Sequence, residues 1–133
     1  MNNPNSLVLK AFNKHFFEFI DDIVLLFPGN THITESRDVI LTMKKANPTA
    51  LIKIWNYFIA EPYKKQIEVG DISFFIEKDY SNDLRYLPNS KEILEAVDAT
   101  IRNPLREMDE VNRSHCIKHI QLISQLSGKY KSS

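Results

Sequence analysis

Apolar residues at helical spacing, separated by Asn-Pro pairs, constrain the fold of this chain more than any other feature. The pairs are Asn3-Pro4, Asn47-Pro48 and Asn103-Pro104. Asn can accept a hydrogen bond from a free N–H group in the first turn of a helix, and Pro fits the first helical position because its φ is preset. The unequal spacings and unlike surroundings of the pairs indicate repeated capping chemistry and not repeated modules. A series of helices is therefore expected.

The segment from Asn47 to Leu84 holds the only Trp of the chain and is expected to organise the core. Pro62 lacks an amide proton, so the helix that begins at Asn47 should bend or restart there. Gly70 is expected to end this helical region, and Asp71 is expected to cap a short helix after it. Five apolar residues recur at intervals that place them on one side of the first helix: Leu51, Ile54, Trp55, Phe58 and Ile59.

Four further helices are expected from periodicity and capping residues. They run from about Ser6 to Phe27, from Thr34 to Lys45, from Ser90, and from about Asp109. Only residues 71–76 are ambiguous between helix and strand. These elements predict an all-α fold: a compact single-domain bundle of about five to seven helices without a significant β-sheet. The domain is expected to span residues 1–133, with short polar tails at about 1–5 and 128–133.

Composition and charge exclude several classes of protein. The 17 basic and 17 acidic side chains cancel, which argues against bulk electrostatic binding to nucleic acid or to an anionic membrane. A single Cys cannot form an intramolecular disulfide, and the first residues lack the layout of a secretory signal, so the protein is not expected to be secreted. No apolar run is long enough for a membrane span, and three Gly leave no phosphate-binding loop.

The acidic segment from Asp79 to Asp83 resembles the start of a calcium-binding loop, which supplies oxygen ligands at alternate positions. The sixth position of such a loop needs Gly for a tight turn, and the twelfth needs a bidentate Glu. This chain has Leu84 and Ser90 at those positions. A capped polar turn is therefore the preferred interpretation.

His115 and His119 lie one helical turn apart with Cys116 beside the first, a spacing that zinc sites use. Cys116 falls on a different side of the helix, and no carboxylate at matching spacing completes a ligand set. We therefore expect two exposed histidines and a small core thiol, with no metal and no cofactor. No acid, base and nucleophile are matched anywhere in the sequence, so the chain is expected not to be an enzyme.

Lysines near aromatic residues between positions 44 and 65 allow another interpretation, a surface for single-stranded nucleic acid. Bases stack on aromatic rings and ammonium groups contact phosphates at such surfaces. Trp55 shares the apolar side of its helix with Leu51, however, which favours a core position. Core aromatic residues and solvated lysines are the preferred interpretation of this group: Lys44, Lys45, Lys53, Lys64 and Lys65 with Trp55, Tyr57 and Tyr63.

Four segments of the chain resemble a group of small helical proteins encoded by nucleocytoplasmic large DNA viruses of algae and protists. They are FFEFIDDIVLLFP, LTMKKANPTALIKIW, YKKQIEVGDISFFIEKDYSNDL and HIQLISQLSGKY, in which KKANP, GDISFF and KDYSNDL follow one another in this order. The resemblance covers most of the chain. It implies a viral origin and a virion component, such as a minor capsid protein, but it transfers no functional residue.

The sequence thus predicts a non-enzymatic structural or protein-interaction module, located in the virion or in the cytoplasm of the infected host cell. Its expected partners are other viral or virion proteins, and a homodimer is expected because the first helix has more apolar residues than one side can bury. The alternative is a nucleic-acid-associated factor in viral replication or packaging. No small-molecule substrate is evident. The candidate interaction surface comprises Phe12, Phe16, Phe19, Phe27, Lys44, Lys45, Lys64, Lys65, Asp79 and Asp83.

Overall fold

The structure is a computed structural model that describes residues 4–77 and 89–131. Within these ranges the chain forms seven continuous helical segments and no strand, which confirms the expected all-α single-domain bundle. In two segments, α-helix continues directly into a π-helical turn, labelled η. The segments are α1 (Pro4–Leu26), α2 (Thr31–Ala46), α3 (Ala50–Trp55) with η1 (Asn56–Ala60), α4 (Lys64–Glu68), α5 (Ser73–Glu77), α6 (Ser90–Val97) with η2 (Asp98–Arg102) and α7 (Asn103–Glu107), and α8 (Glu110–Lys129).

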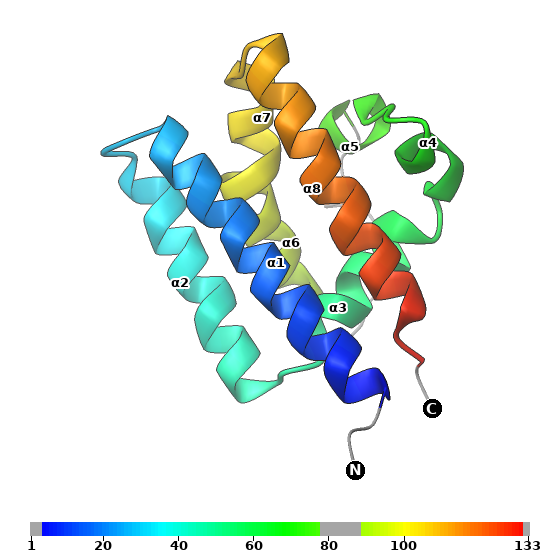
Figure 1. The fold of residues 1–133 in the computed structure, drawn as a ribbon. Coiled ribbons are helices and arrows are strands. Elements are labelled where there is room, and N and C mark those ends of the chain that lie inside the picture. The colour runs from blue at the N-terminus through cyan, green and yellow to red at the C-terminus, as the bar shows by residue number, and fades with distance from the viewer. Residues whose placement is uncertain (1–3, 78–88, 132–133) are drawn as a thin grey trace.

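The first and last helices form the most extensive helix pair of the fold. α1 and α8 run antiparallel and side by side, so the two ends of the described chain meet at one end of the bundle (Figure 1). There, Asn5 donates to the Lys131 carbonyl (2.7 Å) and accepts from its N–H (3.0 Å). α2 packs on α6 and η2, whereas α3 contacts α1, α2, α6 and α8. The short helix α3 is therefore the central element.

The indole of Trp55, at the end of α3, lies at the centre of the core. It is 1% exposed, which confirms the expected core position. The Phe16 ring of α1 meets it edge-on at 5.7 Å, and the Phe75 ring of α5 lies at 5.6 Å. Its Nε1 donates a hydrogen bond to the Ser124 hydroxyl of α8 (2.9 Å). One side chain thus joins α1, α3, α5 and α8.

Two expected helix starts are placed differently in the structure. α2 begins at Thr31 and not at Thr34, because the Asn30 side chain accepts the Ile33 N–H (3.2 Å) and caps the helix earlier. α3 begins at Ala50, and Asn47 does not cap it. The Asn47 N–H instead bonds the Met43 carbonyl (2.8 Å), so that Asn47 ends α2.

The expected stop at Gly70 and the expected cap at Asp71 are both confirmed. Gly70 has a φ of +78°, a conformation that glycine adopts readily, and α4 ends at Glu68. The Asp71 N–H bonds the Gln66 carbonyl (2.8 Å) and the Gly70 N–H bonds the Ile67 carbonyl (3.0 Å), as in a Schellman motif. The Asp71 carboxylate accepts from the Ser73 hydroxyl (2.7 Å) and N–H (3.0 Å), and these bonds lower the pKa of Asp71.

Pro62 and Pro104 each lie just after a π-helical turn. The Glu61 N–H reaches back five residues to the Asn56 carbonyl (2.9 Å) just before Pro62, after which the helix stops and restarts at Lys64. The Asn103 N–H reaches the Asp98 carbonyl in the same way before Pro104. Here the helix continues without a break. A widened turn accommodates a residue that cannot donate to the helical ladder.

Arginine side chains attach α5 to η2 and α7. Arg102, only 3% exposed, donates from Nε to the Phe75 carbonyl and from Nη2 to the Ile76 carbonyl (3.3 Å), and it pairs with Asp98. Arg106 also donates from Nε to the Ile76 carbonyl (3.1 Å). These carbonyls belong to the last turn of α5, where a positive charge is stabilising. The position of α5, and of Phe75 against Trp55, depends on these contacts.

Replacing Ser124 with Ala is expected to lower the free energy of unfolding by about 1 to 2 kcal/mol, because the Trp55 N–H loses its acceptor inside the core. Ser114→Ala is the matched control, since Ser114 is exposed on the same helix and its loss should change stability by at most about 0.5 kcal/mol. Urea unfolding followed by Trp55 fluorescence measures both variants. Equal stability of the two variants would contradict the assigned role of Ser124.

Candidate interaction groove

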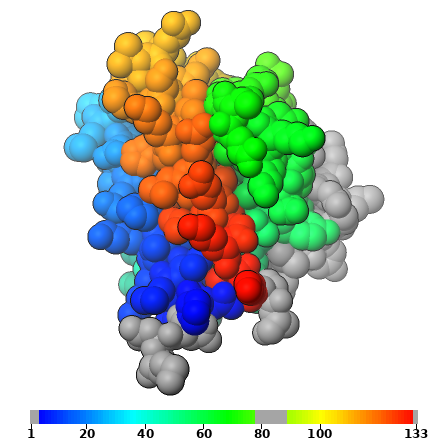
Figure 2. Space-filling model, turned by 45° about the vertical axis from the view of Figure 1, so that its right-hand side comes forward, coloured from blue at the N-terminus to red at the C-terminus, as the bar shows by residue number. Residues whose placement is uncertain are grey.

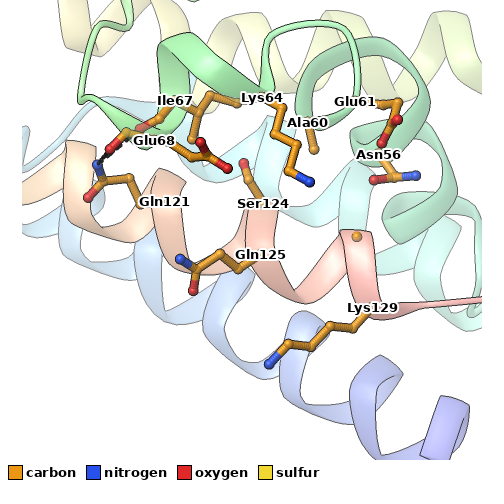
Figure 3. A pocket seen from close by; sticks show the side chains of 11 residues that line it. Asn56, Ala60, Glu61, Lys64, Ile67, Glu68, Gln121, Ser124, Gln125 and Lys129 are labelled. Carbon is orange, nitrogen blue, oxygen red and sulfur yellow. Dashed lines mark hydrogen bonds between the residues drawn. The ribbon is translucent and has the colours of Figure 1, made fainter.

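A groove of about 520 Å³ runs between α8 and the segment formed by η1 and α4. Figure 2 shows α8 along the surface, with α1 on one side and the α3–α5 part of the chain on the other. Figure 3 shows the lining side chains on their two walls. The η1–α4 wall contributes Asn56, Ala60, Glu61, Lys64, Ile67 and Glu68, and the α8 wall contributes Gln121, Ser124, Gln125, Gly128 and Lys129.

Small residues leave space between the walls. Ser124 and Gly128 lie one turn apart on α8, and Ala60 lies on η1. A Cβ atom added at Gly128 would meet no heavy atom within 4 Å. Because nothing fills this position, a side chain or backbone of another molecule can approach α8 closely there.

Unpaired charges line the same groove. Lys64 and Lys129 are exposed, as are Glu61 and Glu68, and none of the four makes an ion pair within the described part of the chain. Figure 3 shows Lys64 extending from the α4 wall toward the α8 wall. The groove therefore offers both signs of charge, together with the amide group of Gln125, which both donates and accepts hydrogen bonds.

Hydrogen bonds between the walls fix their spacing. Gln121 donates from Nε2 to the Ile67 carbonyl (3.0 Å) and to the Glu68 carbonyl (3.4 Å) at the end of α4. At the other end of the groove, the Ser127 hydroxyl lies 2.8 Å from the Ser124 carbonyl of its own helix and 3.3 Å from the Asn56 carboxamide oxygen. The Gln121 bonds therefore tie α4 to α8 at one end of the groove.

The phenylalanines expected at an interaction surface lie in the core. Phe12, Phe16 and Phe19 are 0% exposed, so the prediction that they form a surface is wrong. α1 packs against α2, α3, η2 and α8, and these neighbours cover more of its circumference than a single apolar stripe implies. Phe27, just beyond α1, is half-buried and packs against the core.

The expected lysines do not form one basic surface. Lys44 and Lys45 lie at the end of α2, whereas Lys64 and Lys65 lie in α4, at the opposite edge of the molecule (Figure 1). The Lys44 ammonium group lies 5.4 Å from the centre of the Phe17 ring, a cation–π contact within the chain. Of the four lysines, only Lys64 lines the groove. Asp79 and Asp83 lie outside the described residues.

His119 is placed differently from the prediction of two exposed histidines. Its imidazole is half-buried, stacks on the Phe19 ring at 4.9 Å and lies 2.9 Å from an Asp22 carboxylate oxygen, thereby joining α8 to α1. His115 is exposed, as expected. In residues 4–77 and 89–131, no group of three or more His, Cys, Asp and Glu side chains is placed to hold a metal ion.

Cys116 is buried, which confirms the expected core thiol. Its Sγ lies 3.5 Å from the sulfur of Met108. Burial, and secondarily the negative charge of Asp22, raises the pKa of the Cys116 thiol from 9.0 to about 11. A thiol held neutral in this way is a poor nucleophile at physiological pH.

Sequence reasoning missed most of the groove. Lys64 is among the predicted surface residues, but none of the α8 lining residues is, because the local pattern on that helix indicates only His115, Cys116 and His119 as site candidates. A signal is present in the same helix, where Ser124, Ser127 and Gly128 interrupt the apolar residues. Small and polar residues in an apolar stripe indicate close approach by another element or an open surface.

Comparisons with known proteins assign no family. No family model, no curated protein and no solved structure matches the chain. No helix in the described part of the chain combines the length and the hydropathy needed to cross a membrane.

The thiol of Cys116 is expected to react with a disulfide reagent at least about 100-fold more slowly in the native protein than in the denatured chain at pH 8. The pKa of the thiol is raised from 9.0 to about 11, which reduces the thiolate fraction at pH 8 by about that factor, and burial blocks access as well. The reaction is followed by the absorbance of the released thiolate. Ser114→Cys in a Cys116→Ala background supplies an exposed thiol on the same helix, and equal native rates for the two thiols would contradict the burial.

Proposed function

We propose that this chain is a non-enzymatic protein-interaction module of a large DNA virus, and a component of the particle or of its assembly. The observation that carries the proposal is the groove between α8 and η1–α4, with its unpaired charges and the open position at Gly128. The viral context rests on the resemblance of the four segments quoted above.

The dimensions of the groove suit a short segment of another protein. The lining residues on α8 run from Gln121 to Lys129, which is about two helical turns or about 12 Å. A segment of two turns of helix, or three to four extended residues, matches that length. Small residues along the groove allow close packing, and surrounding charges select the partner and its orientation.

The charge pattern favours protein over nucleic acid. A phosphate backbone at Lys64 would also face Glu61 and Glu68, which stand on the same wall, and like charges oppose binding. The lysines at the end of α2 lie too far away to extend one basic path (Figure 1). The nucleic-acid alternative is therefore the less favoured one.

The chemistry of the groove favours binding over catalysis. Its lining residues include one hydroxyl, that of Ser124, which is occupied as the acceptor of the Trp55 N–H. No His or Cys lies among the lining residues, so this hydroxyl has no adjacent imidazole base. Lysine and glutamate side chains with small residues between them are suited to holding a peptide.

Filling the groove is expected to abolish partner binding without loss of stability. In Gly128→Phe the ring projects into the open space, whereas Gly128→Ala adds only a methyl group and should stabilise the protein by about 0.5 kcal/mol through helix propensity. Thermal unfolding checks the fold of both variants. Pull-down from infected cells with the wild-type, Ala and Phe chains measures binding, and partners retained by the Phe variant would place the binding surface elsewhere.

Mass spectrometry of purified particles is expected to recover this chain in stoichiometric amounts relative to known structural proteins. Absence from particles, combined with retardation of DNA in a gel by the purified chain, would instead support the nucleic-acid alternative. A Lys44→Glu, Lys45→Glu variant tests whether retardation of the DNA depends on these two neighbouring lysines. Both positive charges lie outside the groove.

A further inference from the structure

The outer side of α1 carries an exposed stripe at coiled-coil spacing, of which Asp21 already pairs with Arg37 of α2 (2.7 Å). Six residues recur there at intervals of four and three: Leu7, Ala11, Lys14, Glu18, Asp21 and Leu25. Five of the six are exposed and Ala11 is half-buried, whereas the residues opposite them, including Phe12, Phe16 and Phe19, fill the core. Figure 1 shows this helix at the front of the bundle, with α2 and α8 on either side. Such spacing forms the seam between two packed helices.

The charges on this stripe reverse from one end of α1 to the other. Lys10 and Lys14 lie in its first half, whereas Glu18, Asp21 and Asp22 lie in its second half, and all five are exposed. A second α1 that runs antiparallel across the first would place each basic half against an acidic half. The helix is therefore complementary to itself and not to a uniformly charged partner.

We propose that the outer side of α1 is a homodimer interface, on which a second copy of the chain packs its own α1 antiparallel about a two-fold axis. The register that centres this axis near Phe16 pairs Lys14 with the partner's Glu18 in the middle of the stripe. The same register pairs Leu7 with the partner's Leu25, so apolar contacts close both ends. Each contact occurs twice because a two-fold interface uses the same patch on both subunits.

Leu7 and Leu25 are exposed apolar side chains that a second subunit would cover. Leu25 is 77% exposed and Leu7 is 53% exposed in the monomer, and they stand at the two ends of the charged stripe. Their burial would supply the hydrophobic contribution, and the charges between them would set the antiparallel direction. This interface does not involve the lining residues of the groove, so the inference goes beyond the proposed function and can hold whether or not the groove binds a partner.

Contacts within the monomer already orient the acidic side chains. Glu18 lies 3.2 Å from the His15 imidazole, and Asp22 lies 2.9 Å from that of His119. Both carboxylates are more than half exposed, and a carboxylate has two oxygens with room for further donors. Glu18 can therefore accept Lys14 of the second copy without giving up its present partner.

Charge reversal on the full chain tests the interface. Sedimentation at tens of micromolar is expected to show a dimer for the wild type. Lys14→Glu and Glu18→Lys should each weaken it about tenfold or more, since each change creates two repulsive pairs by symmetry. The double variant Lys14→Glu, Glu18→Lys should regain the dimer, and an equimolar mixture of the two single variants should form a heterodimer.

Matched controls come from α6, where Lys91 and Glu95 are exposed at the same four-residue spacing. Lys91→Glu and Glu95→Lys should leave the dimer unchanged. Leu25→Lys, at a position too exposed to affect folding, should also weaken it, and circular dichroism checks the helix content of every variant. A monomeric wild type at hundreds of micromolar, a dimer unaffected by the single reversals, or a folded double variant that stays monomeric would each overturn the proposal.

Discussion

The hydrogen bond from the Trp55 indole to the Ser124 hydroxyl, set among the rings of Phe16 and Phe75, is the contact on which the rest of this structure depends. An indole N–H buried without an acceptor is costly, so α8 must lie where its hydroxyl meets α3. The rings of Phe16 in α1 and Phe75 in α5 pack against the same indole. Four helices far apart in the chain are thereby positioned around one side chain, and the α8 side of the groove is positioned with them.

Polar side chains that bond the carbonyls at helix ends stabilise the fold in addition to the apolar core. Several helices are too short to be stable alone, and α4 and α5 have five residues each. Gln121 of α8 donates to two carbonyls at the end of α4, and Arg102 donates to two in the last turn of α5. Arg113 likewise donates to the Leu105 carbonyl at the end of α7 (2.8 Å). The Gln121 bonds also fix the position of the α4 wall relative to α8.

A chain with no net charge can still have specific surfaces, because specificity depends on where charges lie. In the groove, lysines and glutamates stand around small residues on facing walls. On α1, the two signs occupy opposite halves of one helix. The first arrangement suits a segment of another protein and the second suits a second copy of the chain. Both surfaces lie on helices whose inner sides pack in the core.

The sequence alone determined the helical class, the core position of Trp55 and Cys116, and the stop at Gly70, because each depends on local spacing or on the conformational range of one residue. Helical periodicity identifies the apolar side of one helix but not how many neighbours cover it. Only the tertiary structure therefore decided that Phe12, Phe16 and Phe19 are core residues, and that Asn30 caps α2 in preference to Thr34. The groove was equally beyond local pattern, since its walls come from two segments far apart in the chain, η1–α4 (Asn56–Glu68) and α8 (Glu110–Lys129), and a surface of that kind exists only once the two segments pack together.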